Sequence, residues 1–284
     1  MLRRWLPALL AALSLGGCSA TGVLAGLTAS PHVLATGDVA YGPGARDHLD
    51  VYRPAGEGPR PVVVFFYGGG WEDGAKKDYR FVGQSLAAAG YLVVVPDYRL
   101  YPQVRYPDFL QDCARAVRWA RDHAAAYGGD PNRLFLMGHS AGAYNAAMLT
   151  LDRRLLAAVG MDPRRDVRGM IGLAGPYDFL PLQSDTLKIV FGPEQNRPAT
   201  QPIAYVAADE PPLLLMHGRT DKVVDPGNAE RLAARVREKG GRVEVVMFPR
   251  LSHPLLLAAL AKPLRGLAPV MADVRGFIER EAAR

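Results

Sequence analysis

The sequence predicts an α/β protein with a mostly parallel central sheet of about eight strands and helices on both faces. Strands buried on both faces read as short, continuous apolar runs. Patterns of this kind occur at residues 61–67 and 91–95, and further strand patterns occur at residues 133–137, 168–173, 212–217 and 242–248. Helical patterns lie between most of them, and an alternation of strands and helices favours a parallel sheet covered on both sides.

The remaining elements follow from their end signals. Residues 39–41 and 49–52 predict an opening hairpin around Gly42, Pro43 and Gly44. The helical pattern of residues 78–89 stops at Gly90, and the pattern of residues 107–127 starts with a proline and closes on two glycines. Further helices are expected at residues 141–149, 228–239 and 267–281.

Residues 175–209 are rich in proline and poorly periodic. A long irregular segment inside a compact domain is usually functional. We therefore expect this segment to form a lid or a pocket wall.

The N-terminus has the pattern of an export signal. Residues 2–4 include two arginines, residues 5–15 are apolar, and small residues precede Cys18. The apolar stretch is too short for a stable membrane span. The pattern resembles a bacterial lipoprotein signal, which implies cleavage before Cys18, lipidation of its thiol and an anchor in the envelope, on the periplasmic side of the outer membrane. The alternative is an ordinary secretory signal with a chance cysteine.

Three segments follow from this interpretation: a signal peptide at residues 1–17, a tether of small residues at 18–37 and one α/β domain at 38–284. A domain of this size buries a large core. The oligomeric state stays open.

Composition restricts the classes of partner. The formal net charge is +6 over 284 residues, without the clustered basic and aromatic residues of a nucleic-acid site. The sequence contains no C-x-x-C or H-E-x-x-H pattern that would predict a metal site, and no cofactor is expected. The second cysteine, Cys113, lies in a helical pattern and is expected to be a buried apolar residue.

Residues 138–142 carry the pattern G-x-S-x-G between a predicted strand and a predicted helix. A serine on a sharp turn needs neighbours without side chains, and the turn exposes its hydroxyl above the sheet. We therefore predict that Ser140 is a nucleophile.

A serine nucleophile needs a base, and among the six histidines only His253 lies after the last predicted strand, where the base of such a fold belongs. His139 sits inside the serine motif, and His217 ends a strand and is expected to be structural. The acid that orients the base is Asp221 or Asp225, both in the loop after residue 217. Asp225 precedes Pro226 and is also suited to starting a helix.

Two further motifs resemble known hydrolase segments. Residues 217–224 resemble the H-G-x-x-D-x-x-V segment of serine hydrolases in the prolyl oligopeptidase and esterase groups, which implies that Asp221 is the acid. Residues 67–71 resemble the H-G-G-G-W oxyanion motif, with Tyr67 in place of histidine. This resemblance implies that the amides of Gly69 and Gly70, together with Ala141, stabilise the oxyanion.

These motifs together resemble the α/β-hydrolase superfamily, in its carboxylesterase branch with arylformamidase-like (BD-FAE) and hormone-sensitive-lipase-like members. The resemblance covers about residues 50–277. It implies a serine esterase for short-chain carboxylic esters, with a small-molecule substrate and no cofactor. Trp71, Tyr177 and Phe179 are candidates for the pocket wall.

Three alternatives stay open at this point. The same serine, histidine and aspartate serve an arylformamidase-like amide hydrolase and a serine peptidase. A lipoprotein that binds or acts as a scaffold without catalysis is an alternative from another class.

Overall fold

The computed structural model describes residues 20–56 and 58–284. The predicted signal peptide and Cys18 lie outside the described residues. Eight strands form a single sheet in this part of the chain: β1 (Val33–Ala40), β2 (His48–Pro54), β3 (Arg60–Phe66), β4 (Leu92–Pro96), β5 (Gly129–His139), β6 (Gly169–Leu173), β7 (Leu213–Gly218) and β8 (Val243–Phe248).

The strands lie in the order β1-β2-β4-β3-β5-β6-β7-β8. β2 runs antiparallel to β1 and β4, and every pairing from β4 to β8 is parallel. The predicted fold class is therefore confirmed. Because parallel strands share one carboxyl edge, the residues that follow β3, β5 and β7 meet at the same edge of the sheet.

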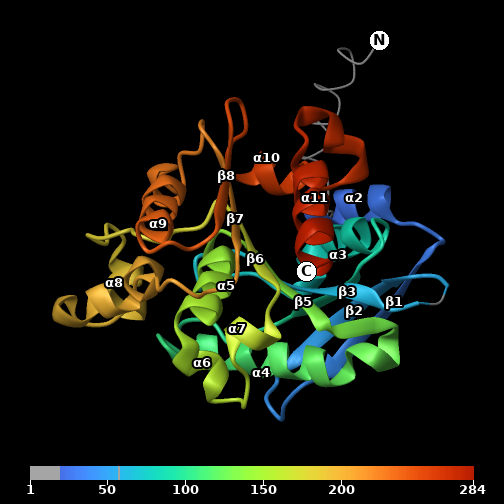
Figure 1. Cartoon of the computed structure of the whole chain (residues 1–284), viewed down its shortest axis with the longest axis horizontal. Coiled ribbons are helices and arrows are strands. Elements are labelled where there is room, and N and C mark those ends of the chain that lie inside the picture. The colour runs from blue at the N-terminus through green and yellow to red at the C-terminus, as the bar shows by residue number, and fades with distance from the viewer. Residues whose placement is uncertain (1–19, 57) are drawn as a thin grey trace.

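Helices cover both faces of the sheet (Figure 1). α4 and α5 pack against β3 and β5, whereas α3 packs against β2 and β4 and α11 against β6. The α-helices are α2 (Ala20–Thr28), α3 (Arg80–Ala87), α4 (Asp108–His123), α5 (Ala141–Leu151), α6 (Arg153–Ala157), α7 (Pro163–Asp166), α8 (Asp185–Val190), α9 (Gly227–Glu238), α10 (His253–Ala258) and α11 (Val270–Ala282).

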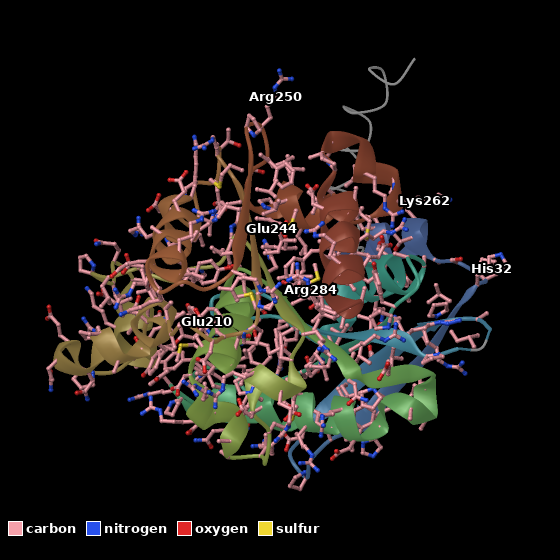
Figure 2. The ribbon with its side chains drawn as sticks, in the orientation of Figure 1. His32, Glu210, Glu244, Arg250, Lys262 and Arg284 are labelled. Carbon is pink, nitrogen blue, oxygen red and sulfur yellow. The ribbon has the colours of Figure 1, made fainter. Side chains whose placement is uncertain are left out.

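Five 3₁₀ helices complete the described secondary structure: η3 (Lys76–Tyr79), η4 (Ala124–Tyr127), η5 (Glu194–Thr200), η6 (Pro202–Tyr205) and η7 (Lys262–Leu267). Strands β3 and β4 lie in the core, and residues Val62 to Phe66 are completely buried. Some charged side chains lie at the periphery: Figure 2 shows Arg250 at the turn after β8 and Lys262, on η7, both pointing outward.

Residues 20–37, the described part of the predicted tether, are folded in the structure. Residues 20–28 form α2, which packs against α3, and β1 pairs with β2 from Val33 onward. The Thr28 hydroxyl lies 2.9 Å from Gln84 Oε1 of α3. Small residues that look like a linker in sequence therefore form a close helix contact here, and residues 20–37 belong to the folded part instead of a tether.

The segment at residues 175–209 is only partly irregular. It contains α8 and the short helices η5 and η6. Their short lengths and the internal Pro198 explain why no helical period was visible in the sequence.

Candidate active site

The turn at residues 138–142, called the elbow below, joins β5 to α5. Ser140 has φ 55° and ψ −124°, a conformation that is sparsely populated for residues with a side chain. A Cβ atom on Gly138 would overlap the carbonyl of Gly142, and one on Gly142 would overlap the carbonyl of Phe66. Both flanking glycines are therefore required by close backbone contacts.

The glycine-rich loop at residues 67–71 follows β3 and lies against the elbow. A Cβ atom on Gly68 would stand 3.0 Å from the Cβ of Ser140. Gly69 and Gly70 have φ values of 116° and 62°. Within the described residues, the amides of Gly69, Gly70 and Ala141 donate no hydrogen bond to another part of the chain. These amides are therefore free to bind an anion.

Tyr67 holds the glycine-rich loop in place. Its hydroxyl donates to Asp97 Oδ1 over 2.9 Å and accepts from Arg46 Nη2 over 2.7 Å. Arg46 also donates to the carbonyl of Gly74, and the Tyr98 hydroxyl donates to the Tyr67 carbonyl. Burial raises the pKa of Tyr67, so the hydroxyl keeps its proton. A tyrosine thus fixes the loop at the position where the motif usually has histidine.

Asp221 and His253 form a close pair. His253 Nδ1 lies 2.7 Å from Asp221 Oδ2, and both side chains are almost completely buried. The amides of Val223 and Val224 donate to Asp221 Oδ1 over 2.8 and 3.0 Å. Burial acts to raise the pKa of Asp221, but the hydrogen bonds from Val224 and His253 outweigh it and hold the pKa below its usual range.

This arrangement determines the proton positions on the His253 ring. Because an ionised carboxylate only accepts hydrogen bonds, Nδ1 carries the proton that points at Asp221. The neutral ring then has an unprotonated Nε2, which is the form a general base requires. His253 is the first residue of the short helix α10.

His139 connects the pair to the elbow. Its ring centroid lies 4.6 Å from that of His253, and its Nε2 lies 3.2 Å from the His253 carbonyl oxygen. Burial, and then the charge of His253, lowers the pKa of His139 to about 3. The neutral His139 ring therefore donates through Nε2, and His253 packs against the residue that precedes Ser140.

His217 also contacts Asp221, and the sequence did not predict this contact. Its Nε2 lies 3.1 Å from Asp221 Oδ2 and 3.1 Å from the Val224 carbonyl oxygen. The contact had a visible signal, since His217 and Asp221 belong to one H-G-x-x-D motif, but the motif does not reveal which way the ring points.

Asp225 lies outside this cluster. Its carboxylate accepts from the amide of Gly227 over 3.0 Å and from Arg231 Nη1 over 3.1 Å. It thus holds the start of α9, and Asp221 is the aspartate that bonds to His253.

A cavity of about 540 Å³ opens at Ser140. Trp71, Phe179 and Leu187 are among its apolar lining residues, so the 175–209 segment supplies one wall. The Trp71 indole is fixed by a 3.0 Å hydrogen bond from Nε1 to Asn145 Oδ1. Tyr177 differs from its expected place in the wall. It is buried and is not among the lining residues, and its ring lies against the backbone of Gly172 and Gly175.

The rim of the cavity is polar. Arg231 on α9 donates to the side chain and the carbonyl of Asp178 over 2.6 and 2.7 Å. Asn228 Oδ1 accepts from the amides of Tyr177 and Asp178, each over 2.8 Å. The start of α9 therefore ties the wall segment to the loop that carries Asp221.

Three further observations concern metal binding, membrane spans and the cysteine of the described residues. No group of three or more His, Cys, Asp or Glu side chains in residues 20–56 and 58–284 is arranged to hold a metal ion. Over the same residues, no helix has the length and apolar character needed to cross a membrane. Cys113 is buried and free.

The sheet order, the strained serine between β5 and α5, and the histidine–aspartate pair after β7 and β8 fit the α/β-hydrolase fold. Solved structures agree on the fold. A truncated carbohydrate esterase from gut microbiota aligns with a TM-score of 0.79 at 19% identity, covering 95% of this chain and 100% of that one. Esterase 2 of Thermogutta terrifontis aligns with a TM-score of 0.68 at 26% identity, covering 86% and 95%.

Residues 49–236 match the sequence model of the family described as BD-FAE, and the chain belongs to this family. A probable isoprenylcysteine alpha-carbonyl methylesterase (ICMEL1) of Arabidopsis thaliana is 30% identical over 259 residues, which cover 84% of this chain and 54% of the relative. Esterase LipQ of Mycobacterium tuberculosis is 28% identical over 267 residues, covering 86% and 62%. The chain thus spans between half and two thirds of the length of these two relatives.

Proposed function

We propose that the chain is a serine carboxylesterase that acts through Ser140, His253 and Asp221. The observation that carries the proposal is the 2.7 Å contact between His253 Nδ1 and Asp221 Oδ2, next to the elbow and its cavity. Further support comes from the relatives, several of which are named esterases.

The reaction begins when His253 Nε2 takes the hydroxyl proton of Ser140. The serine oxygen attacks the ester carbonyl, and the amides of Gly69, Gly70 and Ala141 stabilise the oxyanion. The imidazolium then gives its proton to the departing alcohol, which leaves an acyl-serine. A water molecule, deprotonated by His253, cleaves the acyl-enzyme and releases the carboxylic acid.

We assign short-chain carboxylic esters as the substrates. The cavity volume of about 540 Å³ lies within the range of small-molecule sites, and the fixed indole of Trp71 is part of its lining. Phe179 and Leu187 supply an apolar wall for the acyl or alcohol group.

The first test is hydrolysis of p-nitrophenyl acetate, butyrate, octanoate and palmitate by the purified protein and by Ser140→Ala. The proposal expects turnover that is highest with the short acyl chains and that falls by about 10³-fold or more in the variant. A fluorophosphonate probe should label only the protein with the intact serine. A folded protein with neither turnover nor labelling would favour a catalytically silent binding role.

We further propose that residues 1–17 direct export and that Cys18 carries a lipid anchor on the periplasmic side of the outer membrane, with the catalytic domain following it. The basic, apolar and small-residue order of this segment supports the proposal. Labelling of growing bacterial cells with an alkynyl fatty acid should mark the wild-type chain but not Cys18→Ala. Equal labelling of both would exclude Cys18 as the attachment site.

A further inference from the structure

Asp221 Oδ2 is shared by two histidines. His253 Nδ1 approaches it over 2.7 Å and His217 Nε2 over 3.1 Å, while Oδ1 accepts the amides of Val223 and Val224. The carboxylate is thus held by four donors, and only one of them belongs to the base. The triad proposed above assigns no role to His217.

The surroundings of His217 determine its protonation. Nε2 faces two acceptors, Asp221 Oδ2 and the Val224 carbonyl, so it carries a proton. The side chain is completely buried, and burial lowers its pKa, so the ring is neutral. Its Nδ1 is therefore unprotonated, and it has no hydrogen-bond partner among the described residues.

A buried nitrogen without a partner costs free energy, which a residue that only fills the core would avoid. The His217 ring is instead oriented by Nε2, which points at the Asp221 carboxylate and at the Val224 carbonyl in the same loop. A neutral donor adds a hydrogen bond to the anion without adding a positive charge that would compete with His253.

From this geometry we infer that His217 is a positioning residue for the proposed triad: its Nε2–H fixes Oδ2 of Asp221 in the orientation that aligns His253. The inference rests on the proposed function. His217 also takes up part of the negative charge on Oδ2, which reduces how strongly Asp221 favours the imidazolium form of His253.

Other charged groups face this cluster. His139 packs against the His253 ring and stays neutral because burial lowers its pKa. Asp225 is the other carboxylate nearby, and it is paired with Arg231. Neither His139 nor Asp225 bonds to the Asp221 carboxylate, so we assign the effect on Oδ2 to His217.

The test compares His217→Asn with His217→Gln in the purified full chain. Glutamine carries an N–H at the same number of bonds from Cβ as the Nε2 of histidine, whereas the asparagine amide is one bond shorter and does not reach Oδ2. We expect His217→Asn to lower kcat by about tenfold, which corresponds to about 1.4 kcal/mol, with little change in KM, and His217→Gln to retain most of the activity.

The pH profile gives a readout that a packing role would not move. With one donor fewer, the charge on Oδ2 acts more strongly on His253 and favours its protonated form. The acidic limb of kcat/KM should therefore move to higher pH by about half a unit in His217→Asn and stay near its original position in His217→Gln.

A double-mutant cycle decides whether His217 acts through Asp221. In the Asp221→Ala background, His217→Asn should lower kcat no further. An equal loss in both backgrounds, or equal activity of the folded Asn and Gln variants, would overturn the inference. If His217→Asn does not fold, as judged by thermal unfolding, His217→Leu replaces it in the same comparisons.

Failure of this inference and failure of the proposed function give different results. If Ser140→Ala and Asp221→Ala retain wild-type activity, the triad itself is wrong. If both lose activity while His217→Asn behaves as the wild type, only the role of His217 is wrong.

Discussion

Asp221 and Asp225 lie four residues apart on the same loop and have different hydrogen-bond partners. The Asp221 carboxylate accepts hydrogen bonds from two backbone amides and two histidines. The Asp225 carboxylate accepts from Gly227 and Arg231 at the surface. The first is placed to orient a base, and the second to start α9.

We therefore expect Asp221→Ala to lower kcat by about 10³- to 10⁴-fold, as loss of a triad acid does, and Asp225→Ala to change kcat by less than about threefold. Steady-state kinetics with p-nitrophenyl butyrate measures both variants. Thermal unfolding is the control, because Asp225→Ala also removes a hydrogen bond at a helix start and costs about 1 kcal/mol of stability. A large loss of kcat in Asp225→Ala alone would reverse the assignment.

Sequence patterns identified these residues but not their contacts. The order of serine, aspartate and histidine along the chain, together with the strand pattern, was enough to select Ser140 and His253 as candidates. The four donors around Asp221 come from the end of β7, from the loop after β7 and from α10, and their directions depend on how these segments fold together. Tyr67 illustrates the same limit, since its partners Arg46 and Asp97 are distant in sequence.

At the scale of elements, the elbow depends on the contact between α5 and the end of β3. A Cβ atom on Gly142 would overlap the backbone carbonyls of Phe66 and Tyr67, which cannot move away without disturbing the sheet and the glycine-rich loop. The strain of Ser140 is thus maintained by packing on both sides of the turn.

Gly142→Ala should lower the free energy of unfolding by about 3 kcal/mol, since overpacking against backbone is not relieved by a rotamer change. Gly26→Ala in α2 is the matched control, because a Cβ there meets nothing within 4 Å. We expect the control to be neutral or more stable by up to about 1 kcal/mol. Urea unfolding of the three proteins measures the difference, and equal midpoints would show that the elbow accommodates a side chain.

The strands were more predictable than the short helices. All six strand patterns correspond to observed strands. β4, β6 and β7 are buried along their whole length and therefore need apolar runs, whereas the edge strand β8 is only partly buried. The helices α6, α7, α8 and α10 were not predicted, since each has six residues or fewer and too few turns to show a period. α2 was missed because its small residues resemble those of a linker.

For the whole molecule, the buried histidines link stability to pH. The pKa of His139 is lowered from 6.5 to about 3, and burial also lowers the pKa of His217. In the unfolded chain these side chains bind protons below about pH 6.5, whereas in the folded protein they do not. Their contribution is therefore fully present above about pH 6.5 and decreases as the pH falls toward the folded pKa values.

We expect the free energy of unfolding to fall between about pH 6.5 and pH 4, with His139 alone contributing about 1.4 kcal/mol per pH unit toward the lower end of that range. His139→Gln removes this titration. The number of protons taken up on unfolding should fall by about one, so that the free energy of unfolding decreases less steeply as the pH falls. Urea unfolding at intervals from pH 4 to pH 7.5 gives both curves. Parallel curves would mean that His139 is protonated in the folded protein.

The contact of Gly142 with the Phe66 carbonyl also bears on motion. It joins the serine turn and the glycine-rich loop into one rigid unit, which Tyr67, Asp97 and Arg46 attach to the rest of the sheet edge. We therefore expect these two parts of the site to move together. In the proposed esterase, we expect adjustment to substrates of different size to fall to residues 180–187 of the cavity lining, beyond the anchor that α9 provides at Asp178, so that variation in that short segment changes selectivity without displacing the reacting groups.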